Sequence, residues 1–75
     1  MAPNYHINVF WSDEDACWIA DVPDLQYCSA HGTTPAEAAA EAMIMIQGVV
    51  DSLREHGDLV PEARYRPAIY AARAA

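Results

Sequence analysis

The sequence predicts an α+β fold with two layers, in which one long helix lies across an antiparallel three-stranded sheet and a fourth strand follows at a sheet edge, in the order βββαβ. Three observations lead to this prediction. Short segments near the N-terminus alternate between apolar and polar residues, as half-buried strands do. A later segment carries a helix start signal, a helical apolar period and a stop signal. The 75 residues contain no long linker, as expected for one domain.

The first two strands are expected at residues 5–11 and 16–21. In the first segment Tyr5, Ile7, Val9 and Trp11 fall on one side, which is the pattern of a half-buried strand. In the second, Cys17 and Ile19 face one way and Trp18 and Ala20 the other. The polar residues 12–15 between them favour a turn. The two segments therefore predict an antiparallel hairpin.

A third short strand is expected at residues 27–31. Pro23 and Asp24 end the second strand, because proline donates no backbone hydrogen bond and aspartate favours turns. Beyond the helix, residues 65–71 form the candidate fourth strand. Pro67 within it favours an edge position, where a missing donor is tolerated.

The long helix is expected at residues 35–56. Thr34 and Glu37 have the spacing of a capping box, in which the threonine hydroxyl accepts from the Glu37 backbone and the glutamate reaches back. Pro35 falls at the first helical position, where its missing N–H costs nothing. Gly57 is suited to the left-handed conformation that closes a helix.

One side of this helix is apolar and the opposite side is acidic, when residues are placed at about 100° intervals. The apolar side is expected to pack on the sheet, over Ile7 or Val9 and Ile19. Ile44 lies within the acidic side, either as a solvated side chain or as a contact between subunits. The apolar side comprises Ala39, Met43, Ile46, Val50 and Leu53, flanked by Ala38, Ala42, Met45 and Val49.

The predicted elements form one domain, residues 1–75. Its core is expected at about residues 5–61, followed by a C-terminal strand or tail at 62–75. A domain of this size buries only about 60% of the surface that its unfolded chain exposes. One helix covers one face of the sheet, so the other face, with Trp11 or Trp18 among its candidate residues, needs a partner or water. We therefore expect a homo-oligomer, either a dimer or a tetramer.

Charge is distributed unevenly along the chain. Eleven Asp and Glu residues outnumber four basic residues, which gives a formal net charge of −7. An acidic surface repels phosphate backbones and attracts basic proteins. We therefore expect a basic protein as partner and no direct binding of DNA. The basic residues all lie in the last third of the sequence and are Arg54, Arg64, Arg66 and Arg73.

No group of residues in the sequence predicts catalysis, a metal site or a cofactor. Cys17 and Cys28 lack the spacing of metal ligands and are expected to be reduced thiols. The acidic residues 13–15 lack the alternating oxygen ligands and the glycine of a calcium loop. No serine lies in a nucleophile elbow. We expect a protein that is not an enzyme and, without a signal sequence or a long apolar run, a soluble cytoplasmic one.

Turn, glycine and capping positions also occur here in a specific combination. Its members are Trp18 to Ala20, Pro23-Asp24-Leu25, Cys28, Gly32, Thr34, Glu37-Ala38 and Pro61. Together they resemble the HicB family, the antitoxins of a class of toxin–antitoxin systems. The resemblance implies a partial ribonuclease H-like βββαβ fold without nuclease activity, assembled as an oligomer. It also implies neutralisation of a small basic ribonuclease, HicA, by covering the active site of that toxin.

The sequence departs from the usual HicB pattern in two respects. Gln26 and Tyr27 stand where the family usually has Pro-Gly, which makes Tyr27 an additional candidate contact. Many HicB proteins also carry a C-terminal DNA-binding segment, and this sequence has none, so DNA binding is not expected.

The candidate partner-binding residues are Trp18, Asp24, Leu25 and Tyr27. Aromatic side chains dominate many protein interfaces, but packing within the fold is the alternative for Trp18 and Tyr27. Two other functions are considered beside the antitoxin. One is a small oligomeric scaffold or ligand-binding module without a toxin. The other is a ribonuclease H-like enzyme, which needs carboxylates from separate strands, and the first predicted strand has none.

Overall fold

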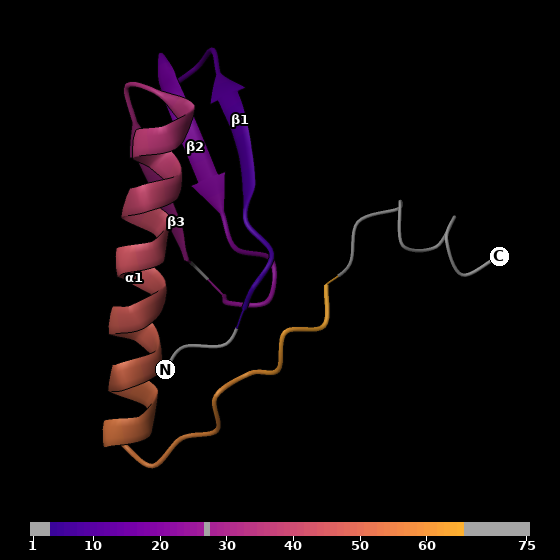
Figure 1. Cartoon of the computed structure of the whole chain (residues 1–75), viewed down its shortest axis with the longest axis vertical. Helices are drawn as coiled ribbons and strands as arrows, with labels where there is room; N and C mark the ends of the chain where they lie inside the picture. Colours follow the sequence, from indigo (N-terminus) through magenta and orange to yellow (C-terminus); the bar gives the residue numbers. More distant parts are fainter. Residues whose placement is uncertain (1–3, 27, 66–75) are drawn as a thin grey trace, which may run out of the picture.

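The computed structural model describes residues 4–26 and 28–65. They form three strands, β1 (Asn8–Ser12), β2 (Cys17–Asp21) and β3 (Ser29–Gly32), followed by the helix α1 (Pro35–Glu55). The strands are antiparallel in the order β1-β2-β3, and α1 lies across one face of their sheet (Figure 1). The predicted two-layer α+β arrangement is confirmed. Of the predicted fourth strand at residues 65–71, only Tyr65 is described, and it lies in no strand.

The first strand begins at Asn8 and not at residue 5, where the alternating pattern placed its start. Asn8 is paired with Asp21, the last residue of β2. The next residue of that chain segment, Val22, donates its N–H to the Cys28 carbonyl at 3.1 Å, inside the β2–β3 connection. Because β2 ends at Asp21, no strand residue lies opposite the residues before Asn8, and the chain there turns Tyr5 into the core, where it is 8% exposed.

The second and third strands are also shorter than predicted. Ala16 has a φ of 51°, the left-handed region, and belongs to the turn between β1 and β2, so β2 begins at Cys17. The third strand begins at Ser29, two positions after its predicted start at 27, and ends at Gly32. The order and the pairing of the strands are unaffected by these differences.

The register of the sheet decides which side chains meet the helix. Residues directly opposite each other on antiparallel strands share a face, and successive residues of a strand alternate. Ala20 is fully buried on the side covered by α1, so its neighbour Ile19 points to the open face. The prediction that Ile19 lies beneath the helix is therefore wrong. The helix side carries the rows Val9, Ala20, Ala30 and Trp11, Trp18, Gly32, and the open face carries the row Phe10, Ile19, His31.

Both predicted ends of the helix are present in the structure. The Thr34 hydroxyl accepts from the Glu37 N–H at 3.1 Å, as in a capping box. The reciprocal contact differs, because the Glu37 carboxylate accepts from the N–H and the hydroxyl of Thr33, each at 3.1 Å. After the C-cap His56, Gly57 has a φ of 73°, the left-handed conformation predicted for it.

The buried side of α1 is rotated away from the predicted row through Met43, which is 64% exposed. The reason is the close approach of the helix start to β3. A Cβ added at Gly32 would lie 2.6 Å from the backbone nitrogen of Ala38, so α1 begins in direct contact with the end of that strand. Because of this contact, the side of α1 that faces the sheet is a row of residues spaced four apart. They are Ala38, Ala42, Ile46 and Val50. Val49 packs against the same cluster, whereas Met45 is 37% exposed.

Candidate functional site

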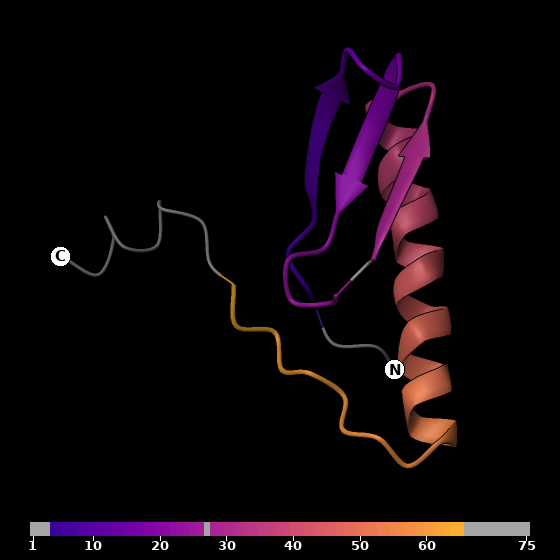
Figure 2. The same ribbon diagram turned by 180° about the vertical axis from the view of Figure 1, so that it is seen from behind.

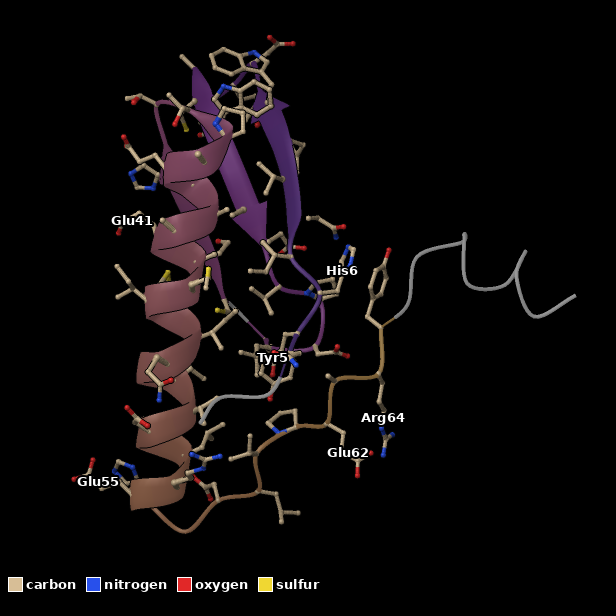
Figure 3. The ribbon with its side chains drawn as sticks, viewed as in Figure 1. Tyr5, His6, Glu41, Glu55, Glu62 and Arg64 are labelled. Carbon is tan, nitrogen blue, oxygen red and sulfur yellow. The ribbon has the colours of Figure 1, made fainter. Side chains whose placement is uncertain are left out.

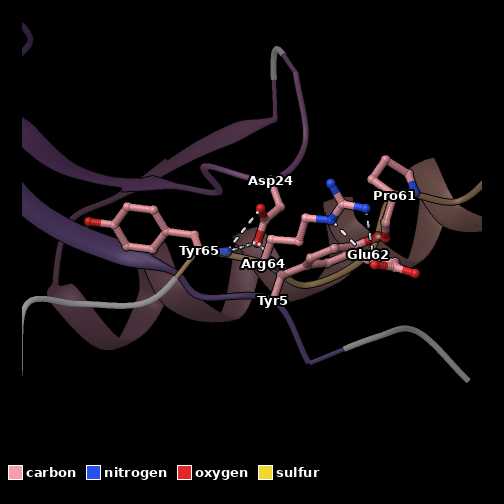
Figure 4. Close-up of polar contacts among 6 residues, drawn as sticks. All are labelled: Tyr5, Asp24, Pro61, Glu62, Arg64 and Tyr65. Atoms are coloured by element: carbon pink, nitrogen blue, oxygen red, sulfur yellow. Dashed lines mark hydrogen bonds and ion pairs between the residues drawn. The ribbon is translucent and has the colours of Figure 1, made fainter. Parts of the chain in front are cut away.

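The carboxylate of Asp24 binds the chain segment that follows the helix, residues 58–65, which we call the C-terminal segment. Asp24 Oδ2 accepts from the Arg64 backbone N–H at 3.1 Å. The Tyr65 N–H donates to both carboxylate oxygens, at 3.2 and 3.1 Å (Figure 4). These bonds connect positions 40 and 41 residues apart. Asp24 was predicted as a partner contact, and the structure gives it an intramolecular role as the anchor of this segment.

Tyr5 and His6 form a second attachment for the C-terminal segment. The Tyr5 hydroxyl donates to the Pro61 carbonyl (Figure 4). The rings of His6 and Tyr65 are 4.7 Å apart between centroids, at an interplanar angle of 44°. Burial, and then the nearby Asp24 carboxylate, raise the pKa of the Tyr5 phenol, while Arg54 acts in the opposite direction. The phenol is therefore neutral and a hydrogen-bond donor near neutral pH.

Leu25 belongs to the core, where its side chain is 4% exposed and offers no surface to a partner. The loop around it closes through backbone hydrogen bonds. The Leu25 N–H donates to Val22 O at 3.1 Å, and the Cys28 N–H donates to Leu25 O at 3.4 Å. Tyr27, the remaining candidate of this loop, lies outside the described residues.

Trp18 is half-buried on the helix side and packs against the core. Its ring meets that of Trp11 edge to face, with centroids 5.7 Å apart and an interplanar angle of 71°. Trp11 is 48% exposed, and its indole N–H donates to Asp13 at 2.8 Å. The two indoles therefore lie on the helix side of the sheet and not on its open face, where the sequence placed one or the other of them. The Trp18 ring belongs partly to the fold and partly to an aromatic surface that includes Trp11.

Apolar side chains are also exposed on the open face of the sheet, on α1 and in the C-terminal segment, where Leu59 is 93% exposed. Phe10, on the open face of the sheet, is 48% exposed. On α1, Ile44 is 66% exposed and Met43 64% exposed. The predicted oligomer contact Ile44 is thus accessible, and Met43 adds to it a neighbouring apolar side chain that the sequence pattern had assigned to the core.

An acidic groove of about 380 Å³ runs between β3 and α1. Sequence reasoning did not find it, because its two walls come from elements that the helix start brings together. The Glu41 carboxylate forms no hydrogen bond or ion pair within the described part of the chain, and its side chain projects from α1 (Figure 3). The residues that line the groove are Ser29, Ala30, His31, Glu37, Glu41 and Met45.

One of the two thiols, that of Cys28, is buried in the core. Cys28 is 2% exposed, and burial followed by the Asp21 charge raises the pKa of its thiol, which disfavours the reactive thiolate. Among residues 4–26 and 28–65, no three His, Cys, Asp or Glu side chains are grouped so as to hold a metal ion. Within the same residues, no helix is long and apolar enough to cross a membrane.

Comparison with known proteins finds one relative among curated sequences. This chain is 30% identical over 53 residues to the UPF0150 protein Ta0767 of Thermoplasma acidophilum, a match that covers 71% of this chain and 77% of the relative. No model of a protein family matches the sequence, and no solved structure matches it. By the extent of the match on both sequences, the chain belongs to the UPF0150 family.

Proposed function

We propose that this protein is a HicB-like antitoxin of the cytoplasm, which binds a small basic ribonuclease toxin of the HicA type and neutralises it by covering its active site. The sequence motif that resembles HicB supports the proposal, as does membership of the UPF0150 family. Within the described residues, the positions of that motif are structural: Asp24 anchors the C-terminal segment, and Gly32 and Thr34 set the start of α1.

The acidic surface is the observation that carries the proposal. All eleven carboxylates lie within the described residues, and none of their side chains is buried. Among the same residues the basic side chains are Arg54 and Arg64 alone. A surface with this balance attracts a basic protein from a distance and repels nucleic acid, so occlusion of a nuclease is better supported than direct RNA or DNA binding.

Co-expression with the product of the adjacent reading frame tests the proposal. We expect that product to be a short basic protein, to copurify with this chain, and to lose its ribonuclease activity when this chain is added in equimolar amount. Full ribonuclease activity in the presence of excess chain would contradict the proposal. DNA binding is a separate question, and we expect none in a mobility-shift assay with the upstream region and this chain alone.

Salt dependence tests the electrostatic part of the mechanism. Attraction between exposed charges is screened over about 8–10 Å at physiological ionic strength. The association rate constant with the toxin should therefore fall as salt concentration rises, with a smaller change in the dissociation rate constant. An association rate that does not change between low and high salt would remove the acidic surface from the binding mechanism.

An oligomeric scaffold without a toxin is the second candidate, and the exposed Met43 and Ile44 on α1 favour it. We expect a homo-dimer or homo-tetramer in light scattering. A mass of 8.2 kDa that persists on concentration would exclude self-association.

For the third candidate, a ribonuclease H-like enzyme, we expect no metal-dependent nuclease activity from the purified chain. Nuclease activity that is lost on mutation of one carboxylate would establish this candidate.

A further inference from the structure

The outer edge of β3 has backbone groups that no strand among the described residues pairs. β3 is the last strand of the sheet and is bonded on one side only, to β2. In both ribbon views the C-terminal segment runs on the β1 side of the sheet, away from β3 (Figures 1 and 2). An uncovered strand edge is a template for pairing with another chain.

The hydrogen-bond pattern identifies which residues offer these groups. In an antiparallel pair, opposite residues alternate between exchanging two hydrogen bonds and exchanging none. Val22 donates to Cys28, so the bonded pairs that follow include Ala20 with Ala30. The N–H and C=O groups of the alternate residues Ser29 and His31 therefore point outward.

The next outward position, Thr33, supports this assignment and shows how the edge is completed at its end. The Thr33 N–H donates to the Glu37 carboxylate at 3.1 Å. At this position an acidic side chain of α1 takes the place that the carbonyl of an added strand would occupy. Ser29 and His31 have no such substitute in α1, and the acidic groove lies directly beside them.

The acidic side chains on the helix wall of the groove favour a basic strand as the one that pairs with β3. Glu37, Glu41 and Met45 are spaced four apart and form one line along α1 beside β3. Side chains of a strand alternate between the two faces of its sheet. Every second residue of an added strand would therefore point toward this line, where a basic side chain meets the Glu37 and Glu41 carboxylates and its apolar stem meets Met45.

From these features we infer that the outer edge of β3 is a docking site at which an extended basic segment of a partner protein adds as a further strand, with its basic side chains along Glu37 and Glu41. Main-chain hydrogen bonds to Ser29 and His31 supply affinity, and the acidic line supplies selectivity. The nature of the partner rests on the proposed function, whereas the site itself is defined by the geometry of β3 and α1.

A peptide of simple composition tests the site directly. The probe is a fluorescein-labelled, alternating Lys-Val heptapeptide, and a version N-methylated at every residue has no backbone N–H to donate to the edge from either side. We expect binding in fluorescence anisotropy, at least about tenfold weaker for the N-methylated peptide. In nitrogen–proton correlation spectra the amides of Ser29 and His31 should shift more than those of Asn8 and Phe10 on β1. Equal affinity for the two peptides would overturn the inference.

Protein variants with matched controls add a second test. His31→Pro removes an outward N–H and leaves the bonds to β2 intact, and His31→Ala removes only the side chain. Glu41→Lys reverses one charge in the groove, and Glu14→Lys makes the same change in the turn between β1 and β2. We expect His31→Pro and Glu41→Lys to weaken peptide binding at least about tenfold relative to their controls. Equal effects of Glu41→Lys and Glu14→Lys on peptide binding would mean that the peptide responds only to the net charge of the protein, and would overturn the inference.

The same variants separate this inference from the proposed function. If a basic toxin binds His31→Pro as tightly as His31→Ala, the toxin docks elsewhere, and the edge inference fails while the antitoxin proposal stands. If no toxin binds the wild-type chain but the peptide binds at Ser29 and His31, the antitoxin proposal fails and the docking site stands. If His31→Pro does not fold, as judged by circular dichroism, the N-methylated peptide decides the matter with wild-type protein.

Discussion

The two halves of the contact between helix and sheet are built from side chains of very different size. Where α1 begins, at the top of Figure 1, Ala38 and Ala42 lie over the small residues Ala20, Ala30 and Gly32, all in one buried cluster or in direct contact with it. These side chains leave almost no space between helix and sheet. This half therefore fixes the distance and the rotation of α1.

The other half lies beyond the end of the sheet and contains the larger apolar residues. Ile46 and Val50 of α1 share the core there with Tyr5, Val22 and Leu25. The C-terminal segment covers this half, through the bonds from Asp24 and Tyr5 and the packing of Val60 and Ala63. Most of the buried apolar volume lies here, so this half should supply most of the hydrophobic stabilisation, roughly in proportion to the area buried. The comparison predicts different responses to mutation in the two halves.

Truncation in the large-residue half should have the largest effect. Ile46→Ala removes a side chain that is 6% exposed and leaves a cavity, which should lower the free energy of unfolding by about 2–5 kcal/mol. Met43→Ala, three positions earlier and 64% exposed, is the matched control and should change it by at most about 0.5 kcal/mol. Urea denaturation measures both values. A larger loss for Met43→Ala would mean that the rotation of α1 differs from the one described.

Enlargement in the small-residue half should have the next largest effect. Gly32→Ala places a Cβ 2.6 Å from Ala38 N, and since the obstacle is backbone, the helix has to shift, at a cost of about 1–3 kcal/mol. The control is Gly48→Ala, where the added Cβ meets nothing within 4 Å and the higher helix propensity should stabilise by about 1 kcal/mol. Thermal melts of the two variants should therefore shift in opposite directions. A Gly32→Ala protein as stable as wild type would show that the close approach imposes no constraint.

Loss of the anchor of the C-terminal segment should have a smaller effect. Asp24→Ala removes three hydrogen bonds to backbone groups at the protein surface, and we expect a loss of about 1 kcal/mol together with faster hydrogen exchange at the Tyr65 amide. Glu62→Ala is the control, because its ion pair with Arg64 joins side chains that are 77% and 79% exposed. That pair should contribute close to nothing measurable. Unchanged exchange in Asp24→Ala would indicate that the segment is held by Tyr5 and packing alone.

A rise to alkaline pH should lower the stability of the fold through two groups of the large-residue half, Tyr5 and Cys28, and this should be the smallest of the four effects. The pKa values of Tyr5 and Cys28 are raised in the folded protein from ordinary values of 10.0 and 9.0. A group whose folded pKa is raised contributes stability below its unfolded pKa and loses it as pH rises through the folded pKa. Stability should therefore begin to fall above about pH 9, and more steeply above about pH 10. In Tyr5→Phe the decline above pH 10 should be shallower than in wild type, and an unchanged slope would mean that the Tyr5 phenol is not responsible.

Local signals in the sequence were sufficient to determine the elements. The helix was predicted at residues 35–56 and lies at Pro35–Glu55, because Thr34, Pro35 and Gly57 act through bonds within one or two turns of the chain. The three strands and the hairpin follow from alternation and turn residues. All three strands begin later than predicted, and β1 and β3 each end one residue later, because a strand extends only as far as its neighbour, which alternation by itself does not encode.

The faces of the elements and the use of Asp24 were decided only by tertiary structure. Ile19 and Ala20 alternate equally well in either orientation, and the contact of Gly32 with Ala38 determines which of them meets the helix. Met43 fits the apolar period of α1 but is exposed, since that contact rotates the helix toward its alanine row. The local sequence predicts that Asp24 is a turn residue, yet its carboxylate accepts hydrogen bonds from backbone N–H groups 40 and 41 positions later. Local hydrogen bonding specifies where the chain is helical or extended, whereas the orientation of each element depends on contacts between distant residues that no short stretch of sequence contains.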